Sequence, residues 1–248
     1  MTLLAAVSQA GVHASVVAPL PGRDTPCYAK SINDWICGDY LRDRRDELVE
    51  ATTSHVQITV TAVLLGLALA VPLALLVRRL PRLEGVVLGG STALYTVPSL
   101  ALFPLLVPLT GLTTTTVVIG LALYCLTILV RALLDGLRAV PDDVRDAARG
   151  LGFGSARLLL RVELPLALPV VLTGLRVATV STVALTTVGT VVSEGGLGRL
   201  IADGKNTQFN AELLTASVLC VLLALLLDAL LVLVQRLSTP WARRARTS

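Results

Sequence analysis

Long apolar runs alternate along the chain with short blocks of charged residues. Five of these runs are long enough to span a membrane, and they cover about residues 56–77, 86–107, 114–130, 166–192 and 213–234. A helix needs about 20 apolar residues to cross a hydrocarbon core roughly 30 Å thick. The pattern therefore predicts an all-α fold: a polytopic membrane bundle of about five transmembrane helices.

The second and fourth runs are irregular. Pro98 and Pro104 lie inside the second run. Proline lacks the N–H that a helix interior uses, so we expect this helix to be kinked or broken. The fourth run is rich in threonine and carries one charge, Arg176, and the fifth run also carries one, Asp228.

Arg176 and Asp228 need an explanation, because a charge at the centre of a bilayer costs roughly 2.5–3.5 kcal/mol on insertion scales. Measured from the same side of the membrane, Arg176 lies about 16 Å deep and Asp228 about 12 Å deep at 1.5 Å per residue. We therefore expect the two side chains to form an ion pair, within one chain or across a dimer. The alternative is that each of them faces water separately.

The composition excludes an ordinary soluble domain. Hydrophobic residues make up 54% of the chain and charged residues 15%, against roughly 25% charged residues in soluble domains, and the mean hydropathy is +0.77. The net charge of +4 could suggest a nucleic-acid partner. However, the arginines border apolar runs and form no basic stripe with interleaved aromatic residues, so we expect no nucleic-acid binding.

The distribution of basic residues predicts the orientation in the membrane. If the polar stretch before the fourth run is cytoplasmic, 13 of the 21 Lys and Arg residues lie inside and seven outside. This arrangement puts the N-terminus outside and the C-terminus in the cytoplasm. A sixth span in residues 1–20 is a weaker alternative, because polar residues interrupt it. The predicted parts are an extracytoplasmic segment 1–49, a transmembrane domain 50–237 with a loop at 141–165, and a basic cytoplasmic tail 238–248.

Two of the four cysteines, Cys27 and Cys37, lie in the polar N-terminal segment. Their spacing allows a small disulfide loop if the segment is outside the cell, and two free thiols are the alternative. The two histidines, His13 and His55, are distant in sequence from these cysteines, so no metal site is predicted. His55 lies at the edge of the first apolar run and is expected to be an interfacial residue. Cys125 and Cys220 lie in apolar runs and are expected to be small core residues.

The loop at 141–165 predicts a short docking helix. Pro141 followed by two aspartates suits a helix N-terminus, and the glycines at 150, 152 and 154 suit its end. Ala147 and Ala148 give this helix a small-residue surface that another backbone could approach closely. The alternative is an ordinary amphipathic helix at the membrane surface.

The same loop resembles the cytoplasmic motif of permeases in ATP-binding-cassette importers. That motif is Glu-Ala-Ala, three residues, Gly, nine residues, an aliphatic residue, any residue, then Leu-Pro. Here Asp146 and Val162 replace Glu and Ile, and every spacing fits. In the family this loop forms a coupling helix that seats in a groove of the ATPase. The resemblance implies an ATPase-coupling role for the matching residues: Asp146, Ala147, Ala148, Gly152, Leu164 and Pro165.

Three further segments, Tyr95–Leu106, Leu164–Val180 and Gly195–Gly198, resemble permeases of the osmoprotectant group, which move glycine betaine, choline, carnitine and similar quaternary amines. The resemblance covers about residues 50–237. It implies a bacterial inner-membrane protein with cytoplasmic ATPase subunits, a second permease chain, identical or homologous, an extracytoplasmic substrate-binding protein and membrane lipid as partners. Glu194 and Arg199 make the external mouth more charged than this group would suggest.

The chain is not expected to be an enzyme or to bind ATP and Mg²⁺ itself, and those cofactors would belong to the partner ATPase. The glycines Gly198 and Gly204 are one residue too far apart for a phosphate loop, and Asn206 stands where Ser or Thr would bind magnesium. No Ser-His-Asp set or cluster of titratable residues is apparent, which also disfavours a membrane enzyme.

Tyr95, Ser99 and Thr187 are the candidate residues of a translocation path, and ordinary helix packing is the alternative for each of them. The spans hold too few aromatic residues to build a cation–π cage for a quaternary ammonium. We therefore expect selectivity to lie mostly in the external binding protein. Two alternative functions remain: a permease of the same class for another small solute such as an amino acid, or an ion-coupled carrier without an ATPase.

Overall fold

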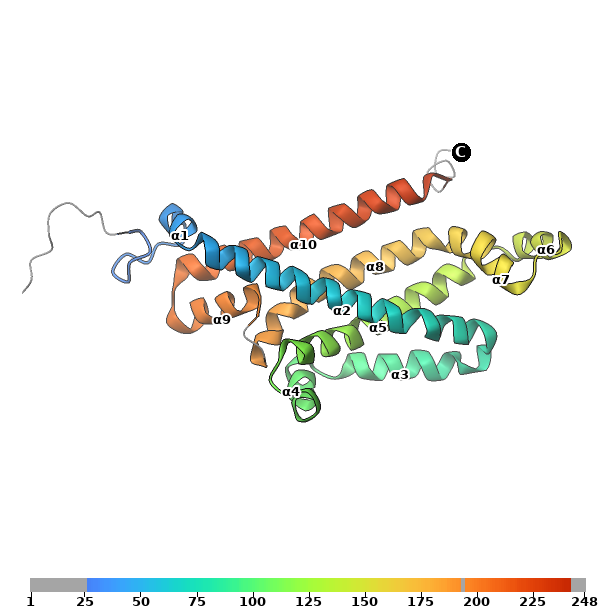
Figure 1. Ribbon diagram of the computed structural model, residues 1–248, viewed down its shortest axis with the longest axis horizontal. Coiled ribbons are helices and arrows are strands. Elements are labelled where there is room, and N and C mark those ends of the chain that lie inside the picture. Colours follow the sequence, from blue (N-terminus) through green and yellow to red (C-terminus); the bar gives the residue numbers. More distant parts are fainter. Residues whose placement is uncertain (1–25, 193–194, 242–248) are drawn as a thin grey trace, which may run out of the picture.

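The computed structural model describes residues 26–192 and 195–241, and within these ranges the chain is helical and contains no strand (Figure 1). The α-helices are α1 (Gly38–Asp43), α2 (Arg45–Arg79), α3 (Glu84–Thr96), α4 (Ser99–Thr110), α5 (Thr114–Arg138), α6 (Asp142–Gly150), α7 (Ser155–Leu158), α8 (Leu164–Thr186), α9 (Leu197–Thr207) and α10 (Asn210–Ser238). Three short helical turns connect some of them: η1 (Pro81–Leu83), the π-type turn η2 (Leu159–Glu163) and η3 (Thr187–Val191).

Four helical segments are long and apolar enough to cross a membrane: Arg45–Arg79, Thr114–Arg138, Ser155–Val191 and Asn210–Ser238. The pair Pro81–Thr96 and Ser99–Thr110 makes a fifth if it is counted as one broken span, with a bend of 100° between its two halves. The prediction of an all-α bundle with about five spans is therefore confirmed.

Helix α5 lies at the centre of the bundle. It packs along most of its length against α2 on one side and α8 on the other, and Leu121, Leu129 and Val130 on it are fully buried. Glycines allow the close approach of these helices, because a Cβ atom at Gly66 or Gly174 would overlap a side chain of α5. Small residues at helix contacts are the usual device of membrane bundles, where backbones must pack closely.

Helix α10 lies at the outside of the bundle and contacts mainly α8 and α9. Large apolar side chains such as Val221, Leu225 and Leu226 are more than half exposed on it. Such a face suits contact with lipid or with another membrane protein, because lipid tails are as apolar as these side chains. The two ends of the bundle differ: α1 and α9 lie at one end and α6 and α7 at the other (Figure 1).

The helices extend beyond the apolar runs that predicted them. Helix α2 begins at Arg45, 11 residues before Val56, so the predicted boundary between residues 49 and 50 lies within a continuous helix. The boundary between residues 237 and 238 likewise falls within the last turn of α10, which ends at Ser238. The division of the chain into these parts stays a prediction. The possible sixth span in residues 1–20 and most of the tail at 238–248 lie outside the described residues.

Candidate functional site

Helix α6 is the short helix that the loop sequence predicts. Pro141 precedes it in an extended conformation, and Asp142 and Asp143 occupy its first turn, where the positive end of the helix dipole favours carboxylates. Gly152 follows its last turn with φ of +82°, a left-handed conformation that glycine adopts without steric cost. The N–H of Gly152 donates to the carbonyl of Arg149, and the N–H of Phe153 donates to the carbonyl of Ala148. These two bonds close the helix end in the manner of a glycine C-cap.

The two faces of α6 differ in exposure. Ala148 is buried against its own chain, with 7% of its surface exposed. Asp146 and Ala147 are exposed, and Leu151 just beyond the helix is 79% exposed. A Cβ atom at Gly152 would meet no other atom within 4 Å. The exposed surface of α6 therefore carries Asp146 and Ala147, with Leu151 and the open Gly152 just beyond the helix. The motif residue Ala148 is not part of this surface, so the expectation that both alanines form it is wrong for Ala148.

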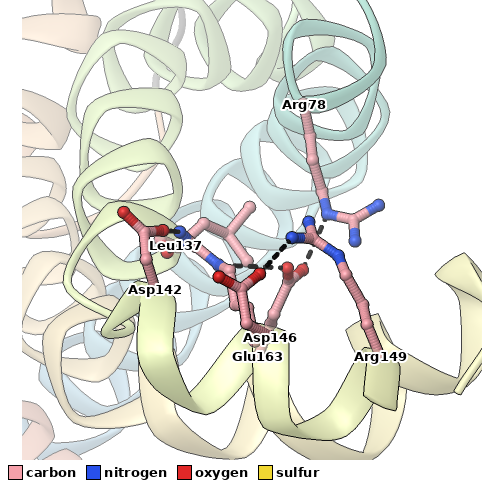
Figure 2. A network of polar contacts seen from close by, with 7 residues as sticks. Arg78, Leu137, Asp142, Asp146, Arg149 and Glu163 are labelled. Carbon is pink, nitrogen blue, oxygen red and sulfur yellow. Dashed lines mark hydrogen bonds and ion pairs between the residues drawn. The ribbon is translucent and has the colours of Figure 1, made fainter.

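A buried carboxylate connects α6 to the spans (Figure 2). Glu163, at the junction of η2 and α8, is 4% exposed. The Nε of Arg78 at the end of α2 donates to Oε2 of Glu163 at 2.7 Å, and the Nε of Arg145 on α6 lies 3.3 Å from Oε1. Arg145 also donates through Nη2 to the carbonyl of Leu137 at 2.5 Å and through Nη1 to Asp142 at 2.7 Å. One carboxylate thus lies between two guanidinium groups that come from different helices.

A cavity of about 730 Å³ lies beside this cluster. Four arginines line it, two from the end of α2 and two from α6, together with the carboxylates of Asp142 and Glu163. Asp146, which belongs to the motif, is exposed and pairs with Arg149 at 2.8 Å, so it takes no part in the contact with Glu163. The inner face of α6 is therefore bound by charge to its own chain, while the outer face is free for a partner.

The last two motif residues, Leu164 and Pro165, form the first turn of α8. This part of the chain is not a loop that ends at the membrane surface, because one helical segment runs from Ser155 through η2 and α8 to Val191. Proline is tolerated in a first helical turn, where its missing N–H would have no partner. The motif thus begins on a separate helix and ends inside a span.

Arg176 of α8 and Asp228 of α10 contact each other within one chain. The guanidinium donates through Nε to Oδ1 and through Nη2 to Oδ2, both at 2.9 Å. About a third of each side chain is exposed. About two helical turns further along, the amide of Gln235 donates to the carbonyl of Pro169 at 3.0 Å. The bidentate pair and this amide form two polar contacts between the outermost helix and the rest of the bundle.

Cys27 and Cys37 are joined by a disulfide, and this N-terminal loop packs on the turn between α9 and α10. The side chain of Asn33 donates to the carbonyl of Gln208 at 2.8 Å and accepts from the N–H of Asn210 at 3.0 Å. The two sulfur atoms also lie near a carboxylate of Asp39. Because they are bonded to each other, they are not available as thiolate ligands for a metal ion.

The candidate path residues do not share one site. Tyr95 lies in the last turn of α3 and lines an open cavity of about 680 Å³, with Arg131 and Asp135 among its other lining residues. Ser99 begins α4 and Thr187 begins η3, and neither lines that cavity. The role of all three residues in translocation stays a prediction.

Sequence reasoning missed two buried polar residues. His55, expected at the membrane edge, is fully buried. It accepts a hydrogen bond at Nδ1 from the N–H of Leu197 at 3.3 Å, so its Nε2 carries the proton and donates to the carbonyl of Val183 at 3.1 Å. Glu163 is the other. Its position just before Leu-Pro, between apolar residues, is a sequence signal of burial, but its partners are remote in the chain.

The comparisons with known proteins agree with this geometry. Residues 62–244 match the family model described as "Binding-protein-dependent transport system inner membrane component". The carnitine transport permease protein OpuCB of Listeria monocytogenes is 32% identical over 84% of this chain and 95% of that protein. The osmoprotectant import permease protein OsmW of Salmonella typhimurium is 35% identical over 81% of this chain and 96% of that protein. The choline transport system permease protein OpuBB of Bacillus subtilis is 30% identical over 81% and 93%.

Solved structures share the fold at lower identity. A chain of the MetNI methionine ABC transporter in an inward-facing conformation has a TM-score of 0.71 at 20% identity and covers 77% of this chain and 96% of its own length. A chain of an amino acid ABC transporter with histidines has a TM-score of 0.63 at 17% identity, over 81% and 98%. Since a family model matches most of the chain and relatives above 30% identity match along nearly their whole length, this chain belongs to the family of inner-membrane permease components of binding-protein-dependent transport systems.

Proposed function

We propose that this chain is the transmembrane permease subunit of an ATP-binding-cassette importer that brings a small quaternary amine, such as glycine betaine, choline or carnitine, into the cytoplasm. Relatives named for carnitine, choline and osmoprotectant import support this substrate class. The observation that carries the proposal is α6. It is a short capped helix at one end of a membrane bundle, and three of its motif residues, Asp146, Ala147 and Gly152, are exposed on it or just after it.

The proposal includes partners that supply what this chain lacks. Two cytoplasmic ATPase subunits would bind ATP and Mg²⁺ and receive the coupling helices of two permease chains, which are identical or homologous. An extracytoplasmic binding protein would deliver the solute. The N-terminal segment would then lie outside, which agrees with its disulfide, because such bonds persist in oxidising compartments. The C-terminus would be cytoplasmic.

Co-purification tests this proposal. The chain is tagged, extracted from native membranes in mild detergent, and its companions are identified by mass spectrometry. An ATPase subunit is expected with the wild type and not with Gly152→Asp, because a side chain at φ of +82° strains the end of α6 and adds a charge to its open face.

The matched control is Gly85→Asp in α3. It is the same substitution at another glycine whose surroundings are open within 4 Å, but at a helical φ and outside α6. The control is expected to keep the ATPase. Recovery of no ATPase with the wild type would contradict the proposal and favour an ion-coupled carrier.

A further inference from the structure

The cluster around Glu163 is the polar link between α6 and the spans. The contact of Glu163 with α2 differs in geometry from its contact with α6. The side toward α2 is a hydrogen-bonded ion pair, Arg78 Nε to Glu163 Oε2 at 2.7 Å. The side toward α6 is a charge contact of 3.3 Å in which the buried Nε of Arg145 makes no hydrogen bond within the described part of the chain. Glu163 is therefore held firmly by α2 and more loosely by α6.

Apart from this cluster, α6 packs mainly on the segments that follow it in the chain. The helix contacts α7 and η2, which continue directly into α8. Arg145 reaches beyond them, since its Nη2 donates to the carbonyl of Leu137 at the end of α5. Through Arg145 and Glu163, α6 is thus connected to α2, α5 and the start of α8 at once. These are the three helices that form the core of the bundle.

Burial strengthens the attraction between Arg145 and Glu163 although they form no hydrogen bond. Only 6% of the Glu163 side chain and 20% of the Arg145 side chain are exposed, so water screens their attraction less than it does at the surface. Removing Glu163 would leave the buried Nε of Arg145 without the carboxylate that it faces. The pair Asp146–Arg149 on α6 is exposed to water, with 70% of Asp146 and 60% of Arg149 accessible, so its loss has no such consequence. The cavity of about 730 Å³ beside Arg145 gives the helix room to tilt.

We propose that Glu163 and Arg145 are positioning residues that transmit displacement of α6 to the spans, so that ATP hydrolysis on the partner is converted into solute movement. The proposal rests on the proposed function, since it assigns α6 the role of the coupling helix. A displacement of α6 pulls or releases Glu163 through Arg145, and Glu163 carries Arg78 and the cytoplasmic end of α2 with it. Loss of the link leaves α6 able to dock but unable to move the spans.

The test separates docking, hydrolysis and transport. The permease is co-purified with its ATPase, reconstituted into vesicles with its binding protein, and supplied with radiolabelled choline, carnitine or glycine betaine. The measured quantity is solute taken up per ATP hydrolysed. Glu163→Gln and Arg145→Gln are each expected to keep the ATPase and its hydrolysis, while uptake per ATP falls at least five-fold.

The matched control is Glu84→Gln. It removes the ion pair between Glu84 and Arg138, which connects α3 to α5 and does not involve α6, so uptake per ATP is expected to stay at the wild-type value. If Glu163→Gln does not fold, Arg145→Gln still decides, because it leaves the Arg78–Glu163 pair intact. The double variant Glu163→Gln/Arg145→Gln should lose no more than the worse single variant.

A wild-type ratio in both single variants, or additive losses in the double variant, would overturn the inference. Failure of the wild-type chain to recover any ATPase is a different result. It would contradict the proposed function itself, before transport is measured.

Discussion

At the scale of single residues, one charge pair helps to hold the outermost helix, α10, against α8. Arg176 and Asp228 carry opposite charges at similar depth in neighbouring spans, and the structure gives them two hydrogen bonds of 2.9 Å. Bidentate geometry of this kind is the strongest form of an arginine–carboxylate contact. The pair explains why a membrane span tolerates each of the two charges.

Asp228→Asn is therefore expected to lower the thermal midpoint of the extracted protein, by roughly a few degrees, because it leaves the Arg176 charge without its partner. The exchange Arg176→Asp with Asp228→Arg should recover most of the loss. Lys205→Gln, an exposed basic residue of α9, serves as the control. A thermal midpoint that the exchange fails to restore would contradict the importance of the pair.

Tyr40 makes the packing of the N-terminal segment sensitive to alkaline pH. Its ring is buried between Tyr28 and Phe209, and burial raises the pKa of the Tyr40 phenol above its ordinary value of 10.0, with Glu212 and Glu47 adding to the effect. The folded state therefore holds this proton more tightly than the unfolded chain does. The associated stability is complete below about pH 10 and is lost as the pH rises above it.

Thermal midpoints measured between pH 8 and pH 11 check this expectation. The wild type should lose stability above about pH 10, and Tyr40→Phe, which keeps the ring contacts but cannot ionise, should lose less. Equal losses in the two proteins would show that another group controls the alkaline transition.

Residue-level prediction from the sequence succeeds where local position defines the partner. The pairing of Arg176 with Asp228 could be anticipated, because each of two spans carries a single charge, the two charges are opposite, and they lie at similar depth. Glu163 could not be assigned partners, since Arg78 lies 85 residues away and the contact exists only once α2 and α8 pack around α5. His55 was placed at the membrane edge for the same reason: the residues that bury it come from the far part of the chain.

At the scale of elements, apolar length predicts that a helix exists better than it predicts where the helix ends. The pre-proline residue Val97 leaves the helical region, with ψ of 126°, as the steric clash with the ring of Pro98 requires. The second span is accordingly broken by 100°. Helix α2 continues well outside its apolar run, and α9 has too few apolar residues to be recognised as an element from composition alone.

The contact between α5 and α8 gives a prediction at this scale. A Cβ atom at Gly174 would lie 2.1 Å from the Cβ of Ala132, so Gly174→Ala should destabilise the bundle by about 1–3 kcal/mol. The same change at Gly90, whose surroundings are open within 4 Å, should have little effect.

A compensating double variant tests whether the overlap of the two Cβ atoms causes the loss of stability. Gly174→Ala combined with Ala132→Gly moves the methyl group to the other helix and should recover most of the stability, measured as the thermal midpoint in detergent. If Gly174→Ala alone has no effect, the close approach of the two helices is not required.

At the scale of the whole molecule, the two ends of the bundle are assigned to opposite sides of the membrane. The disulfide loop and α9 lie at one end and α6 at the other (Figure 1). We expect Lys205→Cys to react with an impermeant maleimide in intact cells, and Arg82→Cys to react only after the membrane is opened.

The native cysteines give this measurement a low background. Cys125 and Cys220 are buried, and Cys27 and Cys37 are bonded to each other. The reverse pattern of labelling would invert the orientation and place α6 outside, where no ATPase can dock.

The proposed function is that this permease moves a quaternary amine with energy from ATP. The most direct measurement uses vesicles that contain the permease, its ATPase and its binding protein, with radiolabelled choline, carnitine or glycine betaine outside. Accumulation is predicted when ATP is supplied to the ATPase side, and it should persist when ionophores abolish all ion gradients. Accumulation that needs a sodium or proton gradient and ignores ATP would contradict the claim.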